Sequence, residues 1–183
     1  MKIFRCNRTP SEPFGEHPGF LLYPDSAVIR DGKPFFVPAF SERWTYRVGL
    51  AWRGCRLGKT IGARFAERYY DAVSLCLFPC PDDLPDGLGA VSTSFDGAVI
   101  LGDWLSLTSI DEPFKCVING CDIDFGQDGL SLEAIIPWIS RYCTLKIGDV
   151  IVSAVADVGL DYPIDSRVEA SLNGRPCLDF RIK

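Results

Sequence analysis

The apolar residues of this chain come in short runs, and turn-forming residues separate one run from the next. Near the amino terminus such runs cover residues 19–23, 27–30 and 34–37, and the dipeptide Asp31-Gly32 lies between the last two. Asp-Gly between two β-prone runs predicts a hairpin, because its tight turn needs the positive φ that glycine adopts readily. The amino-terminal part is therefore expected to form short strands joined by turns.

Further strands are expected later in the chain. Residues 43–52 carry aromatic and small apolar side chains, and residues 150–155 form an apolar run. Residues 168–172 and 178–182 alternate around Asn173-Gly174, which predicts another hairpin. Most of the regular structure should thus be β.

Two short helices are expected beside these strands. Residues 63–71 combine helix formers with apolar side chains at helical spacing. Ser131 is a candidate cap for the second helix, in which Pro137 removes one backbone hydrogen bond and predicts a kink or a later start. Its apolar face carries Leu132, Ile135, Ile136, Ile139 and Cys143. Residues 79–89 hold three prolines and two glycines, which predicts a loop. The expected class is α+β, predominantly β.

Length and charge limit the kinds of protein that the chain can be. At 183 residues it suits one domain over residues 1–183, and 47% apolar with 23% charged residues is typical of a globular chain. A net charge of −5 gives no basic surface for nucleic acid. No apolar run approaches the roughly 20 residues of a membrane helix, and no signal peptide is recognised, so a soluble, cytoplasmic protein is expected.

Eight cysteines are scattered along the chain, and reduced thiols are expected for a protein without a signal peptide. Cys76 and Cys80, and likewise Cys116 and Cys121, lie close in sequence. Neither pair has the two-residue spacing of a zinc knuckle, and the chain has a single histidine. Zinc is not expected.

Residues 54–60 resemble a phosphate-binding loop because they end in Gly58-Lys59-Thr60. The first glycine of such a loop would fall at position 53, which is Arg53. The ring of backbone N–H groups around a phosphate would be incomplete, so a turn between a strand and a helix is expected instead.

His17 is the single histidine, so any Ser-His-Asp or Cys-His mechanism would have to use it. It lies in a segment rich in proline and glycine, where an exposed, solvated side chain is the ordinary outcome. Asp82, Asp83 and Asp86 form an acidic cluster that lacks the spacing of a calcium loop, and a solvated loop is expected there.

The segment from Ser140 to Gly159 resembles the fumarylacetoacetate hydrolase family. In that family the segment carries the sequence motifs TL, PGDVI, TGTP and GVG, in this order. This chain keeps parts of three of them, as Thr144-Leu145, residues 148–151 and Val158-Gly159. Residues 18–27, 94–97, 102–104 and 117–120 resemble further family segments in the same order. The resemblance implies a mixed β-sandwich or roll with a few peripheral helices. Residues 1–40 would form amino-terminal strands and a shortened lid region, residues 41–183 the core, and the protein a homodimer.

The resemblance also implies a divalent cation, Mg²⁺ or Mn²⁺, held by a Glu-x-Glu pair and an aspartate. In this chain the corresponding positions are Arg47, Gly49 and Phe78. Three carboxylates are replaced by one guanidinium, and a cation would meet repulsion instead of ligands. We therefore expect no metal at this site and no cofactor.

Other family positions differ as well. The lysine in the family's FLKP motif corresponds to Tyr23, and the lysine before its SFD motif corresponds to Thr93. The TGTP motif corresponds to residues 153–156. Asp96 persists, although it can equally serve a turn. If the site binds a small carboxylate, the candidate residues are Arg47, Tyr23, Thr93 and Asp96, with Arg47 as the guanidinium that meets the ligand. Alternatively, Arg47 forms a structural ion pair with Asp71, Asp96 or Asp103.

Three hypotheses follow for function. The first is a divergent family member without metal-dependent hydrolysis, which binds a small carboxylate or a protein partner. The second is an active acylpyruvate hydrolase, oxaloacetate decarboxylase or isomerase whose ligands have moved to Asp71, Asp82 or Asp103. The third is a structural or interaction subunit, which exposed apolar patches would support.

Overall fold

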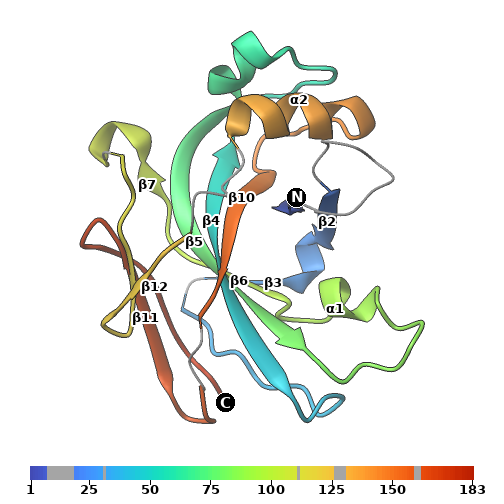
Figure 1. The fold of residues 1–183 in the computed structure, drawn as a ribbon, viewed down its shortest axis with the longest axis vertical. Coiled ribbons are helices and arrows are strands. Elements are labelled where there is room, and N and C mark those ends of the chain that lie inside the picture. Colours follow the sequence, from blue (N-terminus) through green and yellow to red (C-terminus); the bar gives the residue numbers. More distant parts are fainter. Residues whose placement is uncertain (8–18, 31, 111, 126–130, 159–161) are drawn as a thin grey trace.

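Two β-sheets make up most of the structure, a computed structural model that describes residues 1–7, 19–30, 32–110, 112–125, 131–158 and 162–183 (Figure 1). The large sheet has the strand order β2-β1-β10-β4-β5-β6-β3, with β7 paired to β5, and the small sheet has the order β12-β11-β8-β9. The large sheet contains β1 (Lys2–Asn7), β2 (Gly19–Pro24), β3 (Val28–Ile29), β4 (Trp44–Gly54), β5 (Tyr70–Pro81), β6 (Val99–Leu101), β7 (Leu105–Ser106) and β10 (Val150–Asp157). The small sheet contains β8 (Cys116–Ile118), β9 (Cys121–Ile123), β11 (Arg167–Leu172) and β12 (Arg175–Arg181). The predominantly β class is confirmed.

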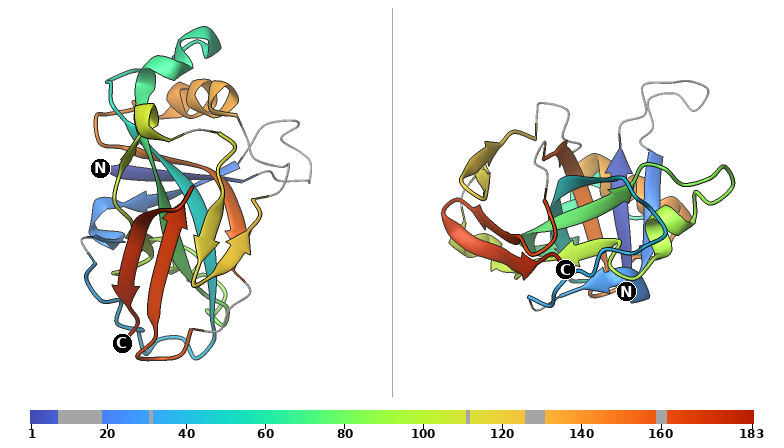
Figure 2. Two further views of the ribbon diagram at one scale, coloured as in Figure 1. Left: turned by 90° about the vertical axis from the view of Figure 1, so that its left-hand side faces the viewer. Right: turned by 90° about the horizontal axis from the view of Figure 1, so that it is seen from below.

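The long strands β4 and β5 form the middle of the large sheet. They pair with each other in antiparallel register, β10 lies antiparallel beside β4, and β1 lies parallel to β10. Seen from below, the strands curl into an open roll with the small sheet at one side (Figure 2). Because side chains alternate across a strand, the large sheet buries residues on both faces, in a main core and a second, smaller cluster.

Helices are few and short. They are α1 (Val91–Ser94), α2 (Leu132–Tyr142) and the 3₁₀ helices η1 (Asp25–Ala27), η2 (Ala63–Tyr69) and η3 (Leu107–Ser109). The expected helix after Ser131 is confirmed as α2, with Pro137 inside it and Leu132, Ile135, Ile136 and Ile139 buried. It packs against η2 at one end of the large sheet (Figure 1). No helix in the described ranges has the length and apolar character to cross a membrane.

At Gly102 the backbone joins the two sheets. Its N–H bonds the Leu75 carbonyl of β5 at 3.0 Å, and the next N–H bonds the Cys177 carbonyl of β12. A Cβ at Gly102 would lie 2.1 Å from that carbonyl oxygen. Only glycine therefore lets the backbone of β12 approach here.

The segment that resembles a family signature serves the scaffold. Asp149 is buried and accepts hydrogen bonds from Lys2 N, Lys2 Nζ and Lys146 N at 2.8, 2.7 and 2.9 Å. The Ser140 hydroxyl accepts from Ile61 N at 2.8 Å, and Gly148 N donates to Gly54 O. These contacts tie α2 to the segment before η2, and the turn before β10 to β1 and to the end of β4.

The predicted hairpin over residues 27–37 is wrong. Residues 28–29 form β3, which pairs in parallel with β6, and residues 34–37 form no strand beyond one bridge between Phe35 and Ile182. The backbone of Phe35 bonds Arg181 O and Lys183 N instead. The Phe35 ring is fully buried, and this long-range pairing satisfies its backbone while it enters the core.

Two boundaries also differ from expectation. The helix predicted over residues 63–71 is the 3₁₀ helix η2, and the strand β5 already begins at Tyr70. The loop predicted from residue 79 begins after Pro81, because β5 continues through both Pro79 and Pro81. The strand and hairpin around Asn173-Gly174 are confirmed as β11 and β12. His17 lies outside the described residues.

Candidate functional site

One face of the large sheet gathers the three positions at which the sequence resemblance places metal ligands. Arg47 on β4 is directly opposite Phe78 on β5, and Gly49 lies two residues along β4 on the same face. The same face carries Cys76 and, from β2, Tyr23, whose ring centre is 5.2 Å from that of Phe78. The structure therefore brings these positions together.

Gly49 lies in a space that its neighbours fill. A Cβ built there would lie 2.6 Å from Val152, 2.9 Å from Phe78 and 3.1 Å from the Cys76 sulfur. Distances under 3.0 Å are not tolerated without movement of the neighbour. The fully buried Phe78 ring thus occupies volume that a side chain at position 49 would need.

Arg47 forms an ion pair with a residue that sequence reasoning did not select. Its Nε lies 2.7 Å from Asp157 Oδ1 at the end of β10, and the two side chains are 42% and 78% exposed. Asp71, one of the expected partners, pairs instead with Arg53 at 2.7 Å. An ion pair this exposed contributes about 0–1 kcal/mol and opens easily.

Arg5 is a further site residue that sequence reasoning missed. It lies on β1, opposite Val152, with a residue exposure of 5%. Its Nη1 donates to the Tyr23 hydroxyl at 2.9 Å, and its guanidinium carbon lies 5.0 Å from the Phe78 ring centre. The signal available in the sequence is a charged residue inside an apolar strand, which proteins rarely bury without a reason.

Comparisons with known proteins agree with this architecture. No family model matches the chain. The mitochondrial oxaloacetate tautomerase FAHD1 of Homo sapiens is 24% identical over 185 residues, which cover 91% of this chain and 81% of that protein. A fumarylpyruvate hydrolase from Pseudomonas aeruginosa, solved with Mn²⁺ and pyruvate, superposes with a TM-score of 0.76 at 18% identity, over 100% of this chain and 89% of that one. A Yersinia pestis protein assigned to the fumarylacetoacetate hydrolase family gives 0.77 at 17% identity, over 100% and 92%.

The chain resembles proteins of the fumarylacetoacetate hydrolase family in sequence and shares the fold of the solved ones. The superposition with the Pseudomonas aeruginosa enzyme covers the whole of this chain. These relatives are named as a tautomerase and a hydrolase, so the resemblance alone does not fix one reaction.

The family's divalent cation does not fit the residues present at this site. Phe78 offers a ring, Gly49 offers no side chain, and Arg47 offers a positive charge, whereas Mg²⁺ and Mn²⁺ prefer anionic oxygen ligands. The buried Arg5 adds a second positive charge on the same face. Within the described residues, no three His, Cys, Asp or Glu side chains come close enough to hold a metal.

The three aspartates considered as relocated ligands lie apart. Asp71 lies at the start of β5 and Asp82 directly after its end, eleven residues further along a strand that rises about 3.3 Å per residue. The Asp82 carboxylate accepts from Thr45 Oγ1 at 3.2 Å. Asp103 lies beyond Gly102, where the small sheet meets the large one. They cannot act on a common ion in this arrangement.

Thr93 and Asp96 lie at α1, which packs beside β2. The Thr93 hydroxyl donates to Ala90 O at 3.2 Å. Asp96 is exposed in a turn closed by the hydrogen bond from Ala98 N to Phe95 O. No contact between described residues joins either side chain to Arg47, so Tyr23 and Arg47 are the two predicted residues that share the face.

Residues 153–156, which replace the family's TGTP, continue β10 past a bulge after Val152. The Ser153 hydroxyl accepts a hydrogen bond from Trp52 Nε1 at 2.8 Å, and both side chains are buried. The first residue of this segment is thus committed to the main core and not to a ligand.

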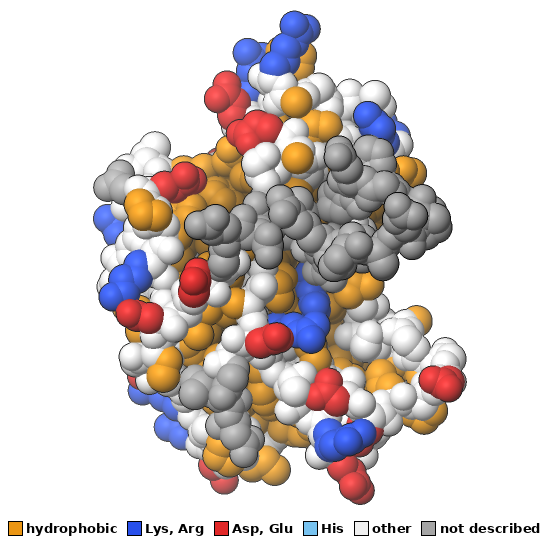
Figure 3. Space-filling model, viewed as in Figure 1, with side chains coloured by type: hydrophobic (Ala, Val, Ile, Leu, Met, Phe, Trp, Pro, Cys, Tyr) orange, Lys and Arg blue, Asp and Glu red, His pale blue; other side chains and the backbone are white. Residues whose placement is uncertain are grey.

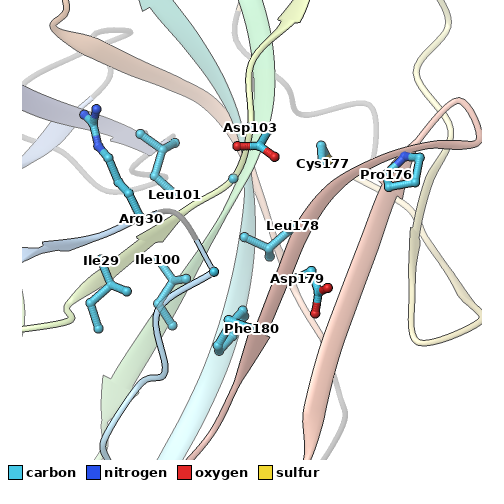
Figure 4. Close-up of a pocket in the computed structure, with 12 residues that line it drawn as sticks. Ile29, Arg30, Ile100, Leu101, Asp103, Pro176, Cys177, Leu178, Asp179 and Phe180 are labelled. Atoms are coloured by element: carbon cyan, nitrogen blue, oxygen red, sulfur yellow. The ribbon is translucent and has the colours of Figure 1, made fainter.

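A groove of about 390 Å³ lies elsewhere, between β6 and β12 (Figure 4). Its charged residues are Arg30, Asp103 and Asp179, and the Arg30 side chain points away from Asp103. Asp179 already makes two hydrogen bonds with Arg167, at 2.8 and 2.7 Å. The polar groups do not converge, and this groove is not the better candidate.

Proposed function

We propose that this protein keeps the family scaffold without metal-dependent hydrolysis, and that it binds a small carboxylate on the β4–β5 face of the large sheet. The observation that carries the proposal is the meeting of Arg47, Gly49 and Phe78 at the positions implied for the metal ligands. Exchanging three carboxylates for a guanidinium changes the charge of these three positions from −3 to +1; Asp157 pairs with Arg47, and the buried Arg5 keeps the face positive. A site of that charge attracts an anion and repels a divalent cation.

Charge and ligand chemistry agree in this proposal. A guanidinium presents parallel N–H groups that match the two oxygens of a carboxylate. The relatives are named for oxaloacetate and fumarylpyruvate, and one of them was solved with pyruvate. Small 2-oxo acids are therefore the first ligands to examine.

The test combines metal titration, turnover and carboxylate binding on the purified protein. We expect no saturable binding of Mn²⁺ or Mg²⁺ by calorimetry, no metal-dependent loss of oxaloacetate or acylpyruvates, and a rise in Tm with pyruvate. Pyruvamide, which has no charge, is the matched ligand control. Stoichiometric Mn²⁺ with metal-dependent turnover would instead favour an active enzyme, and Asp71→Asn, Asp82→Asn and Asp103→Asn, measured one at a time, would then show whether one of these aspartates is a ligand.

A second candidate is an interaction role, because two large apolar side chains protrude together. Leu57 and Ile147 are 63% and 73% exposed on adjoining turns, which are linked by the hydrogen bonds between Gly58 and Leu145. Exposed apolar pairs of this kind mark contact surfaces. We propose that they contribute to a dimer, as the family resemblance implies.

Light scattering after gel filtration tests the dimer. Leu57→Ser with Ile147→Ser should lower the mass towards 20.3 kDa, while Leu88→Ser, at another exposed leucine, should not. An unchanged mass in the double variant would remove these residues from the interface.

A further inference from the structure

Arg5 is a buried cation in a central strand. β1 lies between β2 and β10, and the residue is 5% exposed. Nη1 bonds the Tyr23 hydroxyl, the guanidinium lies over the Phe78 ring, and Nε has no hydrogen-bond partner. Because a guanidinium keeps its charge at every physiological pH, a full positive charge is buried here.

No carboxylate pairs with Arg5 among the residues that the structure describes. Other arginines differ: Arg47, Arg53 and Arg167 each hold a carboxylate oxygen at 2.7 Å, and all three are far more exposed. Burying a charge without a partner is unfavourable, whereas a solvated arginine needs none. The buried Arg5 thus has more to gain from an anion than the exposed arginines, and no described carboxylate supplies one.

A second guanidinium lies close to Arg5. Burial raises the pKa of the Cys80 thiol, while the charges of Arg5 and Arg47 both act to lower it. Both guanidinium groups are thus near one sulfur on the β4–β5 face. The space-filling view shows basic side chains and an acidic one in a hollow at the middle of the molecule (Figure 3).

We propose that Arg5, and not Arg47, holds the carboxylate of the small ligand. This inference rests on the proposed function, that a small carboxylate binds on the β4–β5 face. Nη1 donates to Tyr23 and the Arg5 side chain also hydrogen-bonds with Cys80, whereas Nε has no partner, so its N–H is the donor left for a carboxylate oxygen. The buried positive charge takes the place that the family's cation would have in attracting the ligand.

Tyr23 and Phe78 complete the site. The Tyr23 oxygen accepts from Arg5, so its own proton is available to donate to the same carboxylate. Burial raises the pKa of Tyr23, and the phenol keeps that proton at neutral pH. The Phe78 ring fixes the guanidinium plane by a cation–π contact. Gly49 leaves room for this ring, which explains why the glycine and the phenylalanine occur together.

The test measures pyruvate binding at constant ionic strength by calorimetry. Arg5→Met, which keeps the length of the side chain, should weaken binding on the order of 100-fold. Tyr23→Phe should weaken it about tenfold, because one donor is lost. Arg53→Gln, on the same face but paired with Asp71, is the matched control and should change affinity less than threefold.

The outcomes separate this inference from the proposed function. If the wild-type protein binds no carboxylate, both fail. If pyruvate binding survives Arg5→Met but is lost in Arg47→Gln, the proposed function holds and the assignment to Arg5 is overturned. If chloride or phosphate at the same concentration gives the same affinity, the site is a general anion site and the carboxylate assignment is overturned.

One further measurement uses only the wild-type protein and needs no variant. The Nε–H of Arg5 is buried and should give a protected ¹⁵N–¹H signal, assigned through the backbone. Pyruvate should shift this signal in the wild-type protein, and pyruvamide should not. An unchanged Arg5 signal at saturating pyruvate overturns the inference.

Discussion

Asp149 belongs to the segment that most resembles a family signature, and the structure gives it a scaffold role that mutation can test. Its carboxylate is 1% exposed and receives three hydrogen bonds, from Lys2 N, Lys2 Nζ and Lys146 N. Asp149→Ala leaves two backbone N–H groups without an acceptor. The ammonium, at 28% exposure, can turn to water.

The magnitude follows from these three contacts. An unsatisfied buried backbone N–H costs about 1–3 kcal/mol, and two are left here, while the Lys2 ammonium turns to water and leaves no buried charge. We therefore expect Asp149→Ala to lower the free energy of unfolding by about 4 kcal/mol. With an m-value of about 2 kcal/mol/M, the urea midpoint should fall by about 2 M.

Urea unfolding followed by circular dichroism measures this change. Lys2→Met leaves the buried carboxylate without its cation but with both backbone hydrogen bonds, so it should cost about 3 kcal/mol, the lower end for breaking a buried ion pair. Asp157→Ala removes an exposed carboxylate and should cost less than about 1 kcal/mol. A loss below about 1 kcal/mol for Asp149→Ala, or normal stability with lost pyruvate binding, would refute the scaffold role.

Two further predictions concern the join between the sheets and the buried thiols. Gly102→Ala places a Cβ against the Cys177 carbonyl and should cost about 3 kcal/mol in urea unfolding, whereas Gly89→Ala, with nothing within 4 Å, should cost almost nothing; equal stabilities would contradict the close approach. Burial raises the pKa of Cys6 and Cys116 to about 12 and that of Cys177 to about 11. Their contribution to stability is complete below the unfolded thiol pKa of about 8.5 and is lost as pH rises towards the folded values, by up to about 1.4 kcal/mol per pH unit per thiol. The urea midpoint should fall as the pH is raised from 8.5 to 10.5, and it should fall less steeply in Cys177→Ala than in the wild-type protein. An equal slope in the two proteins would contradict the raised pKa of Cys177.

Local sequence signals predicted the elements whose stability is local. The turn Asn173-Gly174 joins β11 and β12, and the apolar face after Ser131 becomes the buried face of α2. Both need only contacts that are near in sequence or a periodic pattern. The hairpin at Asp31-Gly32 failed because Phe35 pairs with Ile182, a contact that no local pattern contains.

The candidate site was predicted only in part, because some of its contacts join residues that are distant in sequence. The positions of Arg47, Gly49 and Phe78 came from a family resemblance, and their proximity follows once β4 and β5 pair in register. The partner of Arg47 is Asp157, 110 residues away at the end of β10, and the bulge in β10 sets where that side chain lies. Arg5 was missed because β1 reaches this face only through its pairing with β10.

The pairing of β1 with β10 has a consequence for how the chain folds. β1 can pair with β2 once residues 19–24 have been made, but Ile3 pairs with Val150 only after the nearly 150 residues between them have been made. Until then one edge of β1 exposes unpaired backbone groups, which can pair with other chains. Contacts so distant in sequence also slow folding. Productive folding should therefore be completed after synthesis, and expression at lower temperature should raise the yield of the native protein.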